Sequence, residues 1–384
     1  MSLKRIAFLI FLFSSINIFA QPDFSLTGYV VDLPIYQIPG ESQKDSLGNT
    51  KNQFLNLSRA RLHPKLNLWT NARLDIEYEI DALYFSSSND LDLNTSEESN
   101  RQLIDLTWNP VNEEHFNVTH YIDRLYFRQG FDFGNVVIGR QRISWGTGRI
   151  WNPTDLFNPI NPAVFYKVEK DGADAVSMKY IFGNFTDLNL VFNPQKKTKN
   201  SNYGFRFRTN YREYDMSVMG GSFDKRIVGG LDFAGNLLYS VVRGEGIISV
   251  NKDDFDDNFV KFILGIDNQF TPEFYALLEY HYNGEGKTDK TQYEFDKFMR
   301  GEIQNLNKNY LYIGGFYQYN PLLYFSLDNI SNLNDGSGFI NVSCIYSIEE
   351  NLSLYTGTQI TYGSKLSEYW YYSSSLYLEL EFYF

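Results

Sequence analysis

The chain has 384 residues, a formal net charge of −12 and 17% aromatic residues. Its acidity argues against nucleic acid as a partner, because a protein that binds phosphates needs a basic surface. A single cysteine, Cys344, excludes an internal disulfide and a cysteine metal cluster. No apolar run after residue 20 is long enough to form a membrane-spanning helix. This composition fits a transmembrane β-barrel, in which only alternate residues face lipid and aromatic residues gather at both interfaces.

The N-terminus has the pattern of an export signal. Two basic residues precede an apolar run at 6–13, and a small-polar stretch then ends at Ala20. The apolar run is shorter than the ~20 residues that span a bilayer, which argues against a retained membrane helix. We expect residues 1–20 to be a signal peptide and residues 21–384 to form a single outer-membrane barrel with no plug domain.

Turn and charge clusters divide the rest of the chain into about eighteen strand candidates, with sixteen as the alternative. If the first strand is 23–32 and begins in the periplasm, every connection after an even-numbered strand should be a tight turn. All eight are short: 70–72, 132–135, 183–186, 211–213, 233–236, 270–273, 319–321 and 349–351. The connections after odd-numbered strands are mostly longer and polar: 34–53, 86–102, 147–172, 193–201, 252–258 and 284–308. This alternation predicts an all-β, antiparallel up-and-down barrel.

The second and third strand candidates each carry charge on one face. A charge on the lipid face costs about 2–4 kcal/mol for Arg or Lys near the midplane, so we expect the charged faces to line the lumen. A basic row would then lie beside an acidic row, either as ion pairs that stabilise the wall or as part of a charge filter. The predicted pore-lining residues of these strands are Arg59, Arg61, Lys65, Asp75, Glu77 and Glu79.

Three later segments bring pairs of arginines to one face of a strand. Arginines that face carboxylates across a lumen set up a transverse field that filters solutes by charge, and the surplus of arginine suggests a local preference for anions. The alternative is that every arginine is paired and the lumen is nearly sealed. The arginines predicted to face the lumen are Arg124, Arg128, Arg140, Arg142, Arg206 and Arg208.

The segment 139–162 is the most distinctive inside the chain. Strand alternation ends at Trp145, two glycines follow, and three Asn-Pro steps favour extended and turn conformations. Its aromatic and apolar residues would be unnecessary in a solvated outer loop. We therefore expect this loop to fold into the barrel and narrow it, with a cap over the rim as the alternative. The residues predicted for the constriction are Arg149, Trp151, Asn152 and Asp155.

This segment carries a resemblance to a known family. The run Gly139-Arg140-Gln141, followed by Trp145-Gly146 and Asn152-Pro153-Thr154-Asp155, resembles a segment of porin-like outer-membrane families. These families are broadly akin to the alginate-export type of eighteen-stranded porin. The resemblance covers 139–162, the terminal strand and the overall layout. It implies passive or facilitated passage of small solutes, and it names no ligand residue.

The C-terminal segment 375–384 alternates apolar and polar residues and ends on an aromatic residue. Such an end resembles the signal by which outer-membrane barrels are recognised by the barrel-assembly machinery and inserted. We expect it to be the last strand, with lipid and lipopolysaccharide around the barrel. The residues predicted for this insertion signal are Leu380, Phe382 and Phe384.

No pattern in the chain predicts a cofactor, a metal or a catalytic centre. The acidic run 253–257 lacks the spacing and glycine of a calcium loop. Ser144 has no evident histidine partner, which argues against an outer-membrane hydrolase. The sequence thus predicts a non-enzymatic outer-membrane channel for small hydrophilic solutes, anions among them. The alternatives are a closed barrel that binds surface polysaccharide or a protein through its loops, and a hydrolase.

Overall fold

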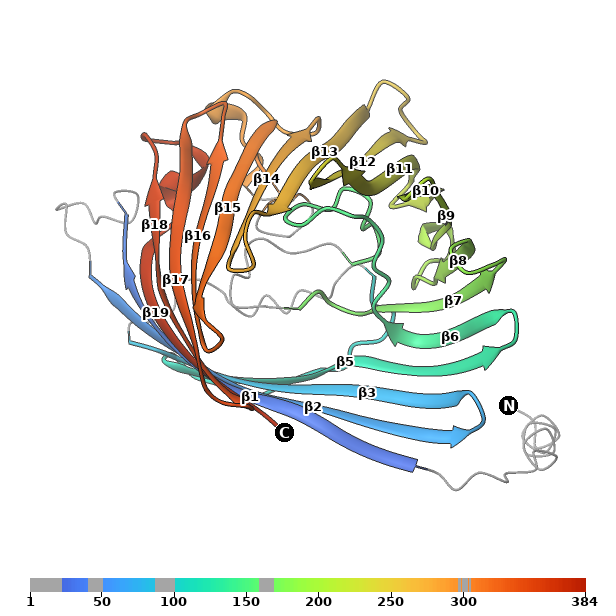
Figure 1. Cartoon of the computed structure of the whole chain (residues 1–384), viewed down its shortest axis with the longest axis horizontal. Helices are drawn as coiled ribbons and strands as arrows, with labels where there is room; N and C mark the ends of the chain where they lie inside the picture. The colour runs from blue at the N-terminus through green and yellow to red at the C-terminus, as the bar shows by residue number, and fades with distance from the viewer. Residues whose placement is uncertain are drawn as a thin grey trace.

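The computed structural model describes residues 23–40, 51–86, 101–158, 169–295, 298, 303 and 305–384, which form a closed antiparallel β-barrel (Figure 1). Strands adjacent in sequence pair with each other, apart from β3 and β4, and β1 pairs with both β2 and β19, which closes the sheet. The predicted signal peptide lies outside the described residues. The strands are β1 (Asp23–Ile38), β2 (Gln53–Trp69), β3 (Ala72–Phe85), β4 (Thr107–Asn112), β5 (Phe116–Phe131), β6 (Gly134–Gln141), β7 (Ala173–Ile181), β8 (Asp187–Asn193), β9 (Asn202–Tyr211), β10 (Tyr214–Phe223), β11 (Arg226–Leu237), β12 (Ser240–Asn251), β13 (Asn258–Gln269), β14 (Phe274–Asn283), β15 (Asn309–Asn320), β16 (Leu323–Asn332), β17 (Ser337–Glu349), β18 (Leu352–Tyr362) and β19 (Ser374–Tyr383).

One of the 19 strands does not span the wall. β3 pairs directly with β5, and the short β4 pairs with β5 only between Asn117 and Tyr121. The partner of β5 from Leu125 onward is β6. β4 therefore continues the wall beside the part of β5 that β6 leaves uncovered. Without β4 the wall has 19 − 1 = 18 strands, so the expected eighteen-stranded antiparallel barrel is confirmed.

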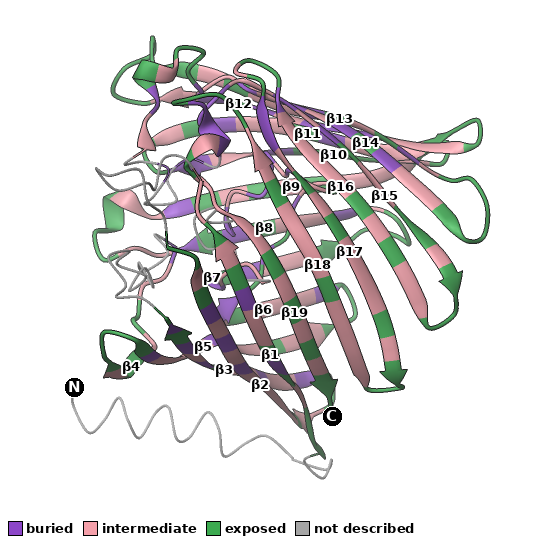
Figure 2. Cartoon of the chain, turned by 90° about the vertical axis from the view of Figure 1, so that its left-hand side faces the viewer, coloured by how far each residue is buried: buried purple, intermediate pink, exposed green. Residues whose placement is uncertain are grey.

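Exposed and less exposed residues alternate along the strands, as Figure 2 shows. On β19 the apolar set faces outward, with Leu376 50% and Phe382 41% exposed, and Phe384 just after the strand is 48% exposed. An outward apolar band needs a lipid environment, because so large a hydrophobic surface is not tolerated in water. The predicted outward face of the last strand is therefore present, and Leu380 and Phe382 belong to it.

Seven of the eight predicted tight turns lie at or beside the observed short connections. The prediction at 233–236 is wrong, because Gly235 and Asn236 remain paired with β12 and the turn falls at Leu238 and Tyr239. Leu238 adopts a φ of 57°, and both turn residues are about 90% exposed. Gly-Asn is an ordinary turn pair and Leu-Tyr is not, so local sequence signals favoured the wrong position.

The first strand is longer than predicted. β1 continues past Asp32 to Ile38, although the sequence pattern predicts a loop that begins at Pro34. Pro34 has no N–H to donate, and it falls where the β1–β19 pairing is interrupted between Asp32 and Ile35. Its place in the β1–β2 pairing, opposite Asn56, is retained. A gap in one ladder thus accommodates the proline inside the wall.

In the described parts of the longer connections, short 3-10 helices lie at Thr198–Asn200, Lys290–Gln292 and Glu368–Tyr371. The long connections after β6 and β14 lie where the sequence placed them. Within the described residues, no helix is both long and apolar enough to cross a bilayer.

Candidate channel interior and inserted loop

A dense array of ion pairs covers the inner face of β2 and β3. The Arg59 guanidinium donates to both carboxylate oxygens of Asp81, at 2.7 and 2.8 Å, and lies 3.0 Å from Glu79. All three side chains are buried. Their pairing follows from the register, because Arg59 lies opposite Asp81 and Arg61 opposite Glu79. The basic and acidic rows predicted from the sequence are therefore adjacent and largely paired.

Arg61 is the centre of this array. Its two terminal nitrogens lie 2.5 Å from carboxylate oxygens of Glu77, Glu79 and Asp123, and one of them lies 3.1 Å from Glu169. Glu169 comes from the connection after β6, so Arg61 ties β2, β3, β5 and that connection together. Four carboxylates would repel one another strongly in a buried site without this cation.

Replacing Arg61 with methionine is expected to lower the free energy of unfolding by about 3–5 kcal/mol, because it leaves buried carboxylates without their shared cation. Urea unfolding of the protein in lipid vesicles measures this loss. The matched control is Arg208→Met, whose side chain is 41% exposed and pairs mainly with Asp187. We expect the control to cost less than ~1 kcal/mol. Equal losses for the two variants would contradict the central role of Arg61.

The other predicted lumen residues differ in their pairing. Arg124 is buried and contacts Asp123, whereas Arg206 pairs with Asp232 at 3.3 Å. Asp75 is buried beside Arg73. Two predicted cations, Lys65 and Arg128, lie on the inner face without an ion pair in the part of the chain that the structure describes. Lys65 is half-buried and Arg128 is exposed.

Arg140 lies on the opposite face of β6 from the one predicted. It shares its face with Ile138, which is 51% exposed on the outer side of the barrel, and it is paired in register with Leu125 and Asp174. The guanidinium bonds to Asp174 at 2.9 Å and to the carbonyl oxygens of Ile104 and Ile122. The segment before β4 thus covers Arg140, which is only 3% exposed. The expectation that Arg140 lines the lumen is wrong.

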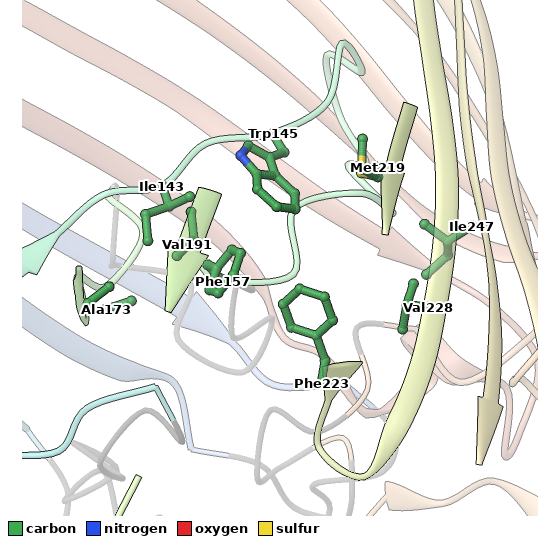
Figure 3. Packing of buried hydrophobic residues seen from close by; sticks show 10 residues of the cluster. Ile143, Trp145, Phe157, Ala173, Val191, Met219, Phe223, Val228 and Ile247 are labelled. Atoms are coloured by element: carbon green, nitrogen blue, oxygen red, sulfur yellow. The ribbon is translucent and has the colours of Figure 1, made fainter. Parts of the chain in front are cut away.

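The segment after β6 turns into the barrel and runs towards β11–β13 (Figure 1). Trp145 and Phe157 are buried in a cluster with inward-facing wall residues such as Met219 and Phe223, shown in Figure 3. The Phe157 ring meets the rings of Trp145 and Phe223 edge-on, with centroids 5.1 and 4.9 Å away. These aromatic residues explain why the loop packs against the inner wall and does not remain in solvent.

Two buried carboxylates of the wall hold the backbone of this inserted loop. Glu279 on β14 accepts hydrogen bonds from the backbone N–H groups of 149, 150 and 151, at 2.8, 3.1 and 2.9 Å. Glu245 on β12 accepts from the N–H groups of 147, 148 and 154 and from the Thr154 hydroxyl, at 2.5 to 3.2 Å. Gly146, with a φ of 98°, allows the approach, since a Cβ there would lie 2.5 Å from Glu245.

The sequence pattern alone does not mark Glu245 and Glu279 as functional residues. Each is a single inward carboxylate on a strand whose neighbouring residues are glycine or face lipid. That pattern would have marked both as lumen-facing. Their partners lie 91 to 130 positions earlier in the chain, so only the folded barrel shows that they hold the loop.

The predicted constriction residues occupy different places in the inserted loop. Trp151 is buried and stacks on His281 of the wall, with ring centroids 5.3 Å apart. Asn152 donates to the Gly148 carbonyl oxygen at 2.8 Å, which closes a tight turn. Asp155 pairs with Lys170 at 2.6 Å. Burial raises the pKa of the Asp155 carboxyl to about 6, although Lys170 opposes this shift.

Arg142 and Arg149 remain exposed on the inserted loop, and neither forms an ion pair with another described residue. Arg149 is close enough to the inward-facing Tyr275 to interact with it electrostatically. Because Arg149 is exposed and Tyr275 lies on the inner face of β14, the Arg149 guanidinium lies on the lumen side of the wall. The loop thus adds unpaired positive charge to an interior whose wall ions are mostly paired.

One group of carboxylates has metal-like spacing. Oxygens of Glu77, Asp123 and Glu169 all lie within 4.8 Å of one another. The Arg61 guanidinium contacts all three, so an arginine already supplies the positive charge that a metal ion would bring. The geometry is that of an ion-pair cluster.

The fold of this chain is similar to that of several solved structures. No protein-family model matches the chain, and no curated protein matches it in sequence. OccAB3 of Acinetobacter baumannii is similar in structure with a TM-score of 0.59 at 9% identity, over 94% of this chain and 99% of that one. OccAB4 of the same organism gives 0.57 at 10% identity, over 94% and 98%. OccK8 (OprE) of Pseudomonas aeruginosa gives 0.57 at 8% identity, over 94% and 98%.

These neighbours are outer-membrane porins. The chain has the porin fold. Identities of 8 to 10% extend the likeness to the fold and no further.

Proposed function

We propose that this protein is an outer-membrane channel through which small hydrophilic solutes, anions among them, diffuse without energy coupling. The observation that carries this proposal is the inserted loop, held inside an eighteen-stranded barrel by Glu245 and Glu279 with two unpaired arginines on its exposed side. A loop fixed at a constriction with charge directed into water is the arrangement that sorts solutes by size and charge.

The charges support a transverse field across the interior. The wall array places five carboxylates, Glu77, Glu79, Asp81, Asp123 and Glu169, around the three guanidinium groups of Arg59, Arg61 and Arg124. It is therefore acidic on balance (5 − 3 = 2). We attribute any preference for anions to Arg142 and Arg149 on the loop, together with Lys65 and Arg128 on the wall.

The rest of the proposal extends the same picture. Residues 1–20 would direct export and be removed, and the outward aromatic end of β19 would serve insertion by the barrel-assembly machinery. Lipid and lipopolysaccharide would surround the apolar outer face. The resemblance of 139–162 to alginate-export-type porins is consistent with a solute channel. Among the described residues, no nucleophile and base are placed together in the interior in a way that suggests catalysis, and we propose a channel and not an enzyme.

Planar-bilayer recording with the purified protein tests the proposal. We expect stepwise insertions, each with a constant ion conductance that scales with salt concentration, because water and ions fill the space beside the inserted loop. A heat-modifiable band on gel electrophoresis shows that the barrel is folded in the same sample. Folded protein that inserts but conducts no ions above background would refute the channel.

A further inference from the structure

One side of the barrel carries no cation in its strands. The stretch 309–383, which forms β15 to β19, contains a single basic residue, Lys365. Lys365 lies in the connection between β18 and β19. By contrast, β2, β5, β9 and β12 all carry arginine on the inner face. We call β15–β19 the cation-free wall.

The inner face of the cation-free wall is polar and rich in tyrosine. Leu327, Val342 and Ile360 point outward to the lipid side and are 46 to 57% exposed, which places the alternate residues on the lumen side. Asp328 lies opposite Asn341, and Asn341 lies opposite Gln359. The half-buried inward residues are Ser326, Asp328, Asn341, Ser343, Tyr355, Gln359, Tyr377 and Glu379.

Hydrogen bonds between strands hold several of these groups in place. Asp328 accepts from the Tyr312 hydroxyl at 2.5 Å and from Ser326 at 3.3 Å. The Tyr377 hydroxyl donates to the Asn341 side-chain oxygen at 3.2 Å. These contacts run along the wall surface, so the polar groups are fixed before any solute arrives. A fixed set of polar groups loses little entropy on binding.

Two groups beside this network remain without a hydrogen-bond partner among the described residues. The Gln359 amide offers two N–H donors and an acceptor, and the Glu379 carboxylate offers acceptors only. Both are half-buried on the lumen side, next to the rings of Tyr377 and Tyr355 in the β18–β19 pairing. The wall thus presents free donors and acceptors beside aromatic rings.

This chemistry matches a neutral solute rich in hydroxyl groups. Each hydroxyl both donates and accepts, so it can pair with amide and carboxylate groups alike, while tyrosine rings contact the apolar ring faces of a saccharide. An anion would find no positive charge on this wall. Building on the proposed channel, we infer that the cation-free wall is a binding track for neutral saccharide-like solutes.

Maltotriose in single-channel recordings is the test. We expect maltotriose to reduce the ion current of the wild-type channel in a saturable way. Gluconate and glucosamine at the same concentration should reduce the current less. In the Gln359→Ala/Tyr377→Ala variant, the half-blocking concentration should rise about fivefold or more, because hydrogen bonds and a ring contact are lost. The control is Tyr346→Ala, which removes a lipid-facing tyrosine from β17, 43% exposed, and should leave the block unchanged.

A second variant, Glu379→Gln, and a direct binding measurement also test the saccharide track. Glu379→Gln preserves shape and is expected to weaken the block about threefold, since it loses a charged acceptor. Calorimetric titration of maltotriose into the protein in detergent reports binding even if the barrel does not conduct. A conducting channel that maltotriose neither blocks nor binds would overturn the track and leave the channel intact. Stronger block by glucosamine than by maltotriose would also overturn it, in favour of a cation site.

Discussion

Replacing Glu245 and Glu279 together with alanine is expected to raise the single-channel conductance about twofold. The two carboxylates accept 4 + 3 = 7 hydrogen bonds from the inserted loop. Without these acceptors, the loop backbone between 147 and 154 would keep buried N–H groups unsatisfied or move away from the wall into water. Conductance traces should also become noisier, because a loop released from the wall fluctuates.

The control for this experiment is a wall carboxylate that does not touch the loop. Asp328→Ala removes the same charge from the inner face, but its partners are Tyr312, Ser326 and Asn341 of the wall. We expect little change in its conductance. Deleting 149–158 should raise conductance further than the double substitution. If both loop variants conducted no more than the wild type, the loop would not be the constriction.

The second large effect is expected from the charge on the loop. Replacing Arg142 and Arg149 with glutamine should lower the anion-to-cation permeability ratio about threefold, because these two guanidinium groups are exposed and unpaired in the part of the chain that the structure describes. The reversal potential in a potassium chloride gradient measures this ratio. Higher salt should diminish the difference between variant and wild type by screening.

The Arg140→Gln variant tests whether ion selectivity depends on the two loop arginines or only on the total number of arginines in the protein. Arg140 is buried on the outer face of β6 and paired with Asp174, so its loss should not change ion selectivity. It should lower stability instead, since Asp174 would lose its partner in a covered site. A change in selectivity with Arg140→Gln, or none with Arg142 and Arg149 replaced, would contradict the assignment of loop charge as the filter.

β6 shows where alternation alone becomes ambiguous. Both faces of β6 carry apolar residues, with Val137 and Gly139 on one face and Ile138 on the other. From the sequence, Arg140 and Arg142 could therefore be assigned to either side of the barrel wall. Only the pairing of β6 with β5 and β7 shows that Ile138 faces the lipid and that Arg140 lies on the same outer face. β2 and β3 were free of this ambiguity, because charged residues filled one face and apolar residues the other over a whole strand.

The eighteen-stranded wall, the alternation of short turns and long connections, and the inward rows of β2 and β3 could all be predicted from the sequence. Each depends on a local rule: residues two apart share a face, and a charge in lipid costs too much to be tolerated. Which charges are paired, which wall residues hold the loop, and which arginines stay free could not be predicted. Those properties depend on contacts such as Arg61 with Glu169 and Glu279 with the loop backbone, which join residues more than a hundred positions apart. Only closure of the barrel brings these groups together, and so only the tertiary structure decides them.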